Sequence, residues 1–302
     1  MNNIETIKSR FRINPVLQKE LKVKMRGWKA AILIGVYNLV LALLTIFILK
    51  ITMSDNPGSV NSQNITVVYA FMVAAQFGLI SLIAPALTAG AISGEREKQT
   101  LDILLSTTLS HWSIITGKLF ASLSQIIILI VSSIPAFSII FLYGGIGVIE
   151  LLQVFLFYIV VAITLGSIGI FFSTFMKKST AANVLSYAFA VFLYLGTIFI
   201  TIFYVQLVIA PSQLTVPYTK TFWLMNFNPA FGLISLVSNQ FGQGGYQIFP
   251  GVSLNAGKGI ALWQINVIFD IGMSVVLLWL SAMKLNPTKK KWSNAFRKIR
   301  KI

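Results

Sequence analysis

Cysteine is absent from the 302 residues of this sequence, and histidine occurs once, at His111. Without cysteine the chain can form no disulfide, no thiolate metal site and no cysteine nucleophile. A single histidine also argues against a histidine-based metal site or a catalytic triad. We therefore expect no catalytic residues, no metal ligands and no enzymatic activity in this chain.

Charged residues are also scarce. They make up 11% of the chain, against about 25% in an average soluble domain, while 56% of the residues are hydrophobic and the mean hydropathy is +0.80. Such a chain has too little polar surface for a soluble fold. We interpret residues 1–302 as one membrane domain.

Long apolar runs define the predicted architecture. A helix needs about 20 apolar residues to cross a bilayer, and six runs reach that length. We therefore predict an all-α integral membrane protein with six transmembrane helices. The predicted spans are 28–50, 65–92, 115–143, 151–176, 181–209 and 260–283.

The distribution of basic residues predicts the orientation. If the N-terminus is cytoplasmic, only Lys50, Lys220 and Lys258 of the 24 Lys and Arg residues lie on the outer side. The positive-inside rule then favours a cytoplasmic N-terminus and a cytoplasmic basic tail at 284–302. The net charge of +16 is thus a topology signal, and anionic lipid rather than nucleic acid is the expected partner.

The segment between the fifth and sixth spans, 210–259, is too long for a simple turn. A seventh span there would place the basic tail outside, against the charge rule. We predict an external or re-entrant helix within 221–241, with Tyr218 and Trp223 as interfacial anchors. A disordered external loop is the alternative.

The N-terminal segment 1–27 does not have the pattern of a signal peptide, because cations recur through it and no short apolar core precedes them. Asn14 and Pro15 predict a helix start, as cap and first-turn residue. We expect Glu20 to pair with Lys24 one turn later. We predict a basic amphipathic helix lying on membrane lipids, either as a general anchor or as a partner contact. Its apolar residues recur at helical spacing: Val16, Leu17, Leu21, Met25 and Trp28.

A charged island at 93–114 interrupts the apolar chain, which has no charge from 56 to 94 or from 119 to 149. Ser93 is the expected cap of a short cytoplasmic helix, and Ser110 the expected cap of the helix that returns to the membrane. Three leucines, at 101, 104 and 105, share one face of the short helix. A plain solvated loop is the alternative interpretation.

Two segments, 94–106 (GEREKQTLDILLS) and 14–21 (NPVLQKEL), carry a resemblance to a known family. The first is similar to the loop after the second span of type-2 permeases of ATP-binding cassette (ABC) transporters, and the second to their N-terminal interfacial helix. The number of spans and the long fifth-to-sixth connection also fit. Gln99 departs from the pattern, since the family commonly has glycine there.

The resemblance implies half of a bacterial cell-membrane exporter. A second permease subunit, identical or homologous, would complete the pathway, and separate ATPase subunits would bind ATP and Mg²⁺. This chain has no G-x-x-x-x-G-K-[ST] phosphate loop of its own. The apolar spans suit a hydrophobic or amphipathic substrate such as a peptide, a lipid-like molecule or a drug. A secondary transporter or channel without an ATPase is the alternative. The resemblance assigns ATPase coupling to Glu95, Arg96, Glu97, Thr100, Leu101, Asp102, Leu104 and Leu105.

Polar residues within the spans are candidates for the translocation path. Asp270 is the clearest, either as a path or cation contact or as a structural hydrogen-bond partner of Gln264 or Asn266. Helix–helix hydrogen bonds are the other interpretation of three further amides: Gln76, Gln125 and Asn183. We also expect Pro85 and Pro135 to kink the second and third spans.

Overall fold

The computed structural model describes residues 15–25, 27–54, 62–106, 110–142, 146–209, 216–217, 223–241, 247–249, 252–253 and 261–285. Within them, six helical runs are long and apolar enough to cross a membrane. This confirms the number of predicted spans.

The six runs lie where the apolar stretches predicted them. The first two are α3 (Trp28–Ser54) and α4 (Ser62–Thr88), and the fourth and sixth are α9 (Val148–Phe175) and α14 (Leu262–Leu285). The third run is α7 (His111–Ser132), continued by α8 (Ile134–Leu142). The fifth comprises α10 (Ser179–Val191), the π-helical turn η1 (Phe192–Gly196), α11 (Thr197–Tyr204) and a second π-helical turn, η2 (Val205–Ile209).

The prolines have different effects on their helices. The third span is interrupted at Ser133, two residues before Pro135, whose ring nitrogen has no hydrogen to donate. Pro85 lies inside α4 near its end, and α4 continues to Thr88. The helix is thus interrupted next to Pro135, whereas α4 is continuous through Pro85.

Helix α9 is the centre of the bundle and packs against α4, α7, α10 and α14. Its glycines permit a close approach to α4, because a Cβ atom at Gly169 would collide with the side chain of Thr88. Small residues at helix crossings are typical of membrane bundles. By contrast, α3 exposes large apolar side chains, including Val36, Leu43 and Phe47.

The segment between the fifth and sixth spans contains more than the predicted helix. Its described parts are the 3-10 helix η4 (Trp223–Phe227), α13 (Pro229–Gln240) and three short strands: β1 (Val216–Pro217), β2 (Gln247–Phe249) and β3 (Val252–Ser253). The strand order is β1-β3-β2, with β1 parallel and β2 antiparallel to β3.

The bundle is all-helical, as predicted, and this small sheet is confined to the connection between the fifth and sixth spans. The strands are too short to show the alternation by which strands are recognised in sequence. Helix α13 agrees with the helix predicted within 221–241, and it buries Phe231, Leu233 and Leu236 while packing against α9 and α14. The anchor proposed at Tyr218 lies outside the described residues, and the side chain of Trp223 is likewise not described.

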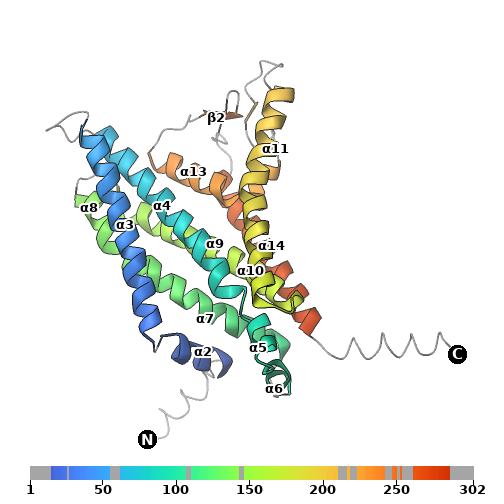
Figure 1. Ribbon diagram of the computed structural model, residues 1–302. Coiled ribbons are helices and arrows are strands. Elements are labelled where there is room, and N and C mark those ends of the chain that lie inside the picture. Colours follow the sequence, from blue (N-terminus) through green and yellow to red (C-terminus); the bar gives the residue numbers. More distant parts are fainter. Residues whose placement is uncertain are drawn as a thin grey trace, which may run out of the picture.

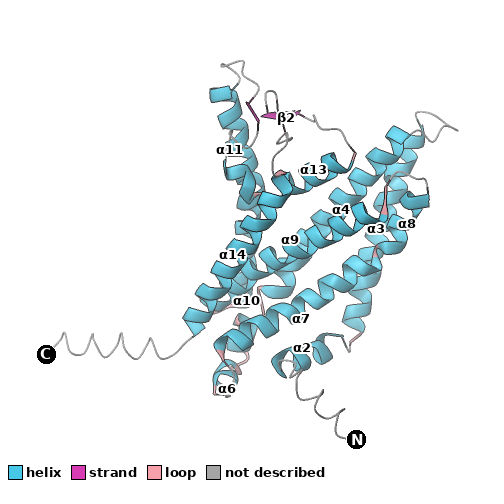
Figure 2. Cartoon of the chain, turned by 180° about the vertical axis from the view of Figure 1, so that it is seen from behind, coloured by secondary structure: helices cyan, strands magenta, loops and turns pink. Residues whose placement is uncertain are grey.

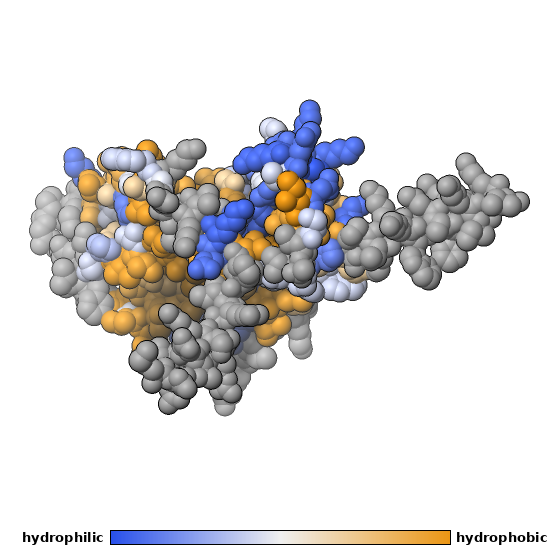
Figure 3. Space-filling model, turned by 90° about the horizontal axis from the view of Figure 1, so that it is seen from below, coloured by the Kyte–Doolittle hydropathy of each residue, from blue (hydrophilic) through white to orange (hydrophobic). Residues whose placement is uncertain are grey.

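The two ends of the bundle differ in character (Figures 1 and 2). At one end lie α2 (Pro15–Met25), α5 (Ser93–Glu97), α6 (Leu101–Leu105) and the connection from α9 to α10. We call this the charged end, because the elements there carry Lys19, Arg96, Lys98, Lys118, Lys177, Lys178 and Lys284. Helix α13 and the strands lie at the opposite end, as does Lys50 near the end of α3. Figure 3 looks onto the charged end and shows hydrophilic residues on a protruding part of it.

Candidate functional site

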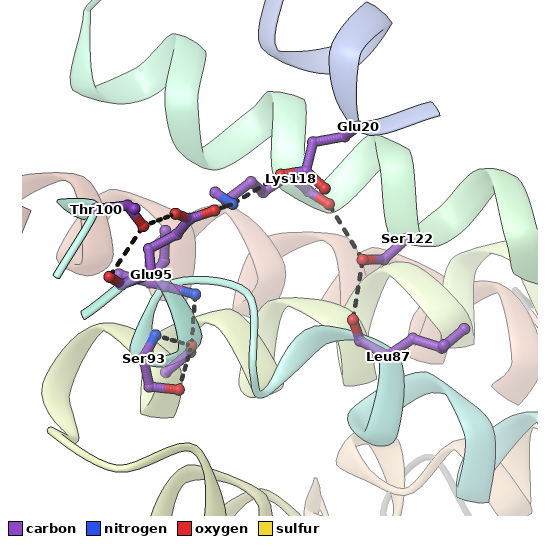
Figure 4. A network of polar contacts seen from close by, with 9 residues as sticks. Glu20, Leu87, Ser93, Glu95, Thr100, Lys118 and Ser122 are labelled. Atoms are coloured by element: carbon purple, nitrogen blue, oxygen red, sulfur yellow. Dashed lines mark hydrogen bonds and ion pairs between the residues drawn. The ribbon is translucent and has the colours of Figure 1, made fainter. Parts of the chain in front are cut away.

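A buried lysine joins three elements at the charged end. The Nζ atom of Lys118, on α7, lies 2.8 Å from Oε1 of Glu20 on α2 and 2.9 Å from Oε1 of Glu95 on α5. The side chain of Lys118 is only 5% exposed, against 22% for Glu20 and 28% for Glu95. Figure 4 shows the ammonium group between the two carboxylates. We call Glu20, Glu95 and Lys118 the junction.

The junction is held in place by the local structure of α7. Ser110 caps this helix by accepting a hydrogen bond from the backbone N–H of Ser113 at 3.2 Å, as predicted. One turn after Lys118, the hydroxyl of Ser122 donates to the carbonyl oxygen of Leu87 on α4 at 3.1 Å (Figure 4). A buried ammonium group is tolerated only when it is paired and hydrogen-bonded. Lys118 meets this condition with two carboxylates.

Glu95 is also fixed from within the loop. Its other carboxylate oxygen, Oε2, accepts a hydrogen bond from the hydroxyl of Thr100, which precedes α6. Burial by itself raises the pKa of Glu95, but the hydrogen bonds from Thr100 and Lys118 and the charges of Lys118 and Lys98 outweigh it, so the pKa is below its ordinary value. Glu95 therefore remains ionised and bound to Lys118 at neutral pH.

Helix α5 is capped by a distant residue and not by Ser93. The residue before the helix, Ile92, makes no side-chain cap. The hydroxyl oxygen of Ser173 on α9 accepts hydrogen bonds from the N–H groups of Ile92 and Ser93, at 2.8 and 2.9 Å. The hydroxyl of Ser93 instead donates to the carbonyl of Ala89 at 3.0 Å. The predicted Ser93 cap is thus wrong, because a partner 80 residues away cannot be recognised from the local sequence.

Arg96 and Glu97 bind the α9–α10 connection. The guanidinium group of Arg96 donates to the carbonyl oxygens of Met176 and of Thr174, the latter at 3.1 Å. The carboxylate of Glu97 accepts from the N–H and the hydroxyl of Ser179, each at 2.8 Å. A cation thus lies at the C-terminal end of α9 and an anion at the N-terminal end of α10, and each charge interacts favourably with the dipole of that helix. The Ser179 hydrogen bonds lower the pKa of Glu97.

The turn between α5 and α6 has an unusual backbone. Gln99 has φ of 57°, a left-handed conformation, and it is the only non-glycine residue with positive φ in the described chain. Glycine adopts this conformation at no steric cost. The geometry therefore explains why a glycine is common at the corresponding position of the resembling permeases.

The leucine face of α6 packs within the chain. Leu101 is buried in a cluster with Val16, Ile92, Ile114 and Leu285, and Leu104 and Leu105 pack partly against the same cluster. Asp102 and Ile103 point away from it, and Ile103 is 68% exposed. The resemblance assigned these leucines to coupling with the ATPase. Sequence reasoning missed that Val16 and Leu285, from the two ends of the chain, already cover Leu101.

The predicted N-terminal residues divide between two helices. Pro15 begins α2, which ends at Met25, and Leu17, Glu20 and Leu21 are partly buried in it. Trp28 begins α3 instead and is 85% exposed. Asn14 lies outside the described residues, and so does the side chain of Lys24, the partner predicted for Glu20. The structure pairs Glu20 with Lys118 instead.

The structure therefore brings together the predicted N-terminal helix and the charged island. Helix α2 packs along α7, and Val16 of α2 contacts the cluster around Leu101. The polar residues predicted within the spans are separate from these elements. Gln76, on α4, donates to the hydroxyl of Ser133 at 2.9 Å, which supports its interpretation as a helix–helix contact. Gln125 and Asn183 are partly buried on α7 and α10. Asp270 is buried on α14.

Comparison with known proteins gives one finding. A sequence model of the family described as "ABC-2 family transporter protein" matches residues 14–254. No curated protein matches the chain. The matched region begins just before α2 and includes the whole junction, α5, α6 and the α9–α10 connection.

Proposed function

Since the chain belongs to the ABC-2 transporter family, we propose that it is the permease subunit of an ATP-driven exporter in a bacterial cell membrane. In this proposal separate ATPase subunits bind ATP and Mg²⁺, and a second permease subunit, identical or homologous, completes the pathway. The cargo is hydrophobic or amphipathic, in keeping with the apolar spans.

The charged end faces the cytoplasm in this proposal. The basic residues of the described helices and their connections gather there, with Lys50 at the opposite end. Positive charge is retained on the cytoplasmic side of bacterial membranes. Helix α2 then lies at the inner membrane surface, where anionic headgroups attract its cations.

The observation that carries the proposal is that α5 and α6 are tied to four other helices. Lys118 links α5 to α2 and α7, and the contacts of Arg96 and Glu97 link it to α9 and α10. A displacement of this loop by a partner therefore acts on the third, fourth and fifth spans together. This is what a coupling element between an ATPase and the membrane requires.

The surface left for the ATPase is the outer face of α6. Most of the apolar area of Leu101, Leu104 and Leu105 is used inside the chain, and Glu95, Arg96 and Glu97 are engaged with neighbouring helices. Ile103 is the large exposed apolar side chain of this helix, with Asp102 exposed beside it. In the proposal Ile103 enters a groove of the ATPase, and Asp102 contributes electrostatic complementarity at the rim.

Copurification tests the proposal. The tagged chain, extracted in mild detergent, should retain an ATPase subunit, and Ile103→Asp should lose it because a charge enters a buried apolar contact. Gln18→Asp is the matched control, since it adds the same charge at an exposed position of the neighbouring helix α2. Retention of the ATPase by Ile103→Asp would exclude α6 as the docking element. Full transport by the chain with no ATPase would favour a secondary transporter.

A further inference from the structure

Asp270 differs from the ionisable residues of the junction because its buried carboxyl group has no hydrogen-bond partner. It lies inside α14, about eight residues or roughly 12 Å from the start of that helix. It is 1% exposed, and neither of its carboxylate oxygens has a hydrogen-bond partner. Buried polar groups in native proteins are nearly always paired, so an unpaired carboxyl group needs a specific explanation.

A structural role does not explain it. Of the two partners expected from sequence, Asn266 directs its amide to the carbonyl oxygen of Asn226 at 2.8 Å, and the side-chain oxygen of Gln264 accepts from the N–H of Ala261. Thr164 and Ser274 do bond at this position, but both donate to the backbone carbonyl of Asp270, at 3.3 and 2.7 Å. The carboxyl group thus contributes no hydrogen bond to the packing.

The surroundings of Asp270 suit a cation. Asn266, one turn before Asp270 on α14, donates to the carbonyl oxygen of Asn226 at 2.8 Å, and Asn228 donates to that of Tyr194 at 3.0 Å. Tyr194 lies in the π-helical turn η1 of the fifth span. Its hydroxyl pairs with that of Ser81 at 3.0 Å, and its ring packs edge-on against Phe77 at 5.7 Å. Aromatic ring faces attract ammonium groups, and aromatic side chains recognise quaternary ammonium ligands. π-helical turns are also frequent at functional sites, where they interrupt the regular helix.

We propose that Asp270, together with the ring of Tyr194, binds the ammonium head of a cationic amphipathic cargo. The inference rests on the proposed function and deepens it by naming the cargo class. The packing of α14 against α9 leaves the carboxyl group without a partner, and the cargo supplies one when the helices around it separate. The apolar surfaces of the spans accept the tail of the same molecule.

Two matched probes test this on the full chain in lipid nanodiscs without any ATPase. They are radiolabelled dodecyltrimethylammonium and its uncharged isostere, in which carbon replaces the quaternary nitrogen. The wild-type chain should bind the cation about tenfold more tightly than the isostere, as one desolvated cation contact permits. Asp270→Asn should abolish this preference while leaving the affinity for the isostere unchanged. Asp270→Glu should restore part of it.

Three further variants distinguish the site from a general perturbation of the structure. Ser274 lies one turn away on α14, and its hydroxyl donates to the backbone carbonyl of Asp270 and to the hydroxyl of Thr164. It makes no contact with the carboxyl group, so Ser274→Ala should keep the preference. Tyr194→Leu should weaken binding of the cation severalfold, and Tyr194→Phe should not, because the ring rather than the hydroxyl makes the contact. The two Tyr194 variants also test the proposed site if Asp270→Asn does not fold.

An undiminished preference in both Asp270→Asn and Tyr194→Leu would overturn the proposal, as would no preference in the wild-type chain. Because the assay omits the ATPase, its result is independent of the copurification experiment. Failure to retain an ATPase with an intact cation preference would remove the exporter proposal and leave the cation site. The reverse pattern would remove the cation site alone.

Discussion

The buried charged groups of the junction are paired, whereas the buried carboxyl group of Asp270 is not. At the junction Lys118 is nine-tenths buried and touches two carboxylates, and the neighbouring Arg96 and Glu97 are each bonded twice. Asp270 is more deeply buried than any of them and has no partner for its carboxyl group. A fully paired network holds helices in fixed relation. Asp270 is the acidic residue among the buried groups of the described chain that lack a hydrogen-bond partner, and its carboxyl group is available to a molecule from outside.

Breaking the ion pairs of the junction should have the largest effect on stability. Lys118→Met leaves the carboxylates of Glu20 and Glu95 close together without their cation. Loss of one partner of a buried ion pair costs 3–5 kcal/mol, and because both carboxylates are partly exposed we expect about 2–3 kcal/mol here. Thermal denaturation in detergent should show a melting temperature lower by several degrees.

Lys98→Met is the matched control for that change. Lys98 is exposed directly after α5, and its replacement removes the same charge from the same end of the bundle. Its melting temperature should stay close to that of the wild-type chain. Equal melting temperatures for the two variants would contradict the paired description of the junction.

Removing the distant cap of α5 should have an intermediate effect. Ser173→Ala leaves the buried N–H groups of Ile92 and Ser93 without an acceptor, at a cost of about 1–3 kcal/mol. Ser167→Ala is the control, since Ser167 is also buried on α9 but donates only to the carbonyl of Ile163 in its own helix. In thermal denaturation, Ser173→Ala should lower the melting temperature more than Ser167→Ala does. If Ser167→Ala were the more damaging, the cap would have no energetic role.

Relieving the left-handed turn should have the smallest effect, and it should be favourable. Gln99→Gly removes the steric cost of φ at 57° and should stabilise the chain by about 0.5–1 kcal/mol. Lys98→Gly, one residue earlier where φ is −79°, should destabilise it slightly because glycine there only adds freedom to the unfolded chain. In thermal denaturation, the melting temperature should rise with Gln99→Gly and fall with Lys98→Gly. A stabilising Lys98→Gly with a destabilising Gln99→Gly would show that the turn is not strained at Gln99.

The same two regions show how far sequence reasoning reached. The spans were predictable because apolar runs of this length have few alternatives, and the island stood out because charges are rare around it. The pairing of Lys118 with Glu20, 98 residues apart, was not predictable, since local patterns suggest only partners within one turn. Asp270 was recognisable as unusual from its type and position alone. Its lack of a partner became visible only with the packing of α14 against α9.

The central claim is that the junction transmits motion from the charged end to the spans. The absence of cysteine from the sequence allows site-specific spin labels at Lys50→Cys and Val148→Cys, both at the end opposite the charged end. Pulsed electron resonance on the complex with its ATPase subunits would measure the distance between these labels with and without trapped ATP. The account predicts an ATP-dependent shift in the wild-type background and with Lys118→Arg, but not with Lys118→Met while the ATPase stays bound. An equal shift in Lys118→Met would contradict it.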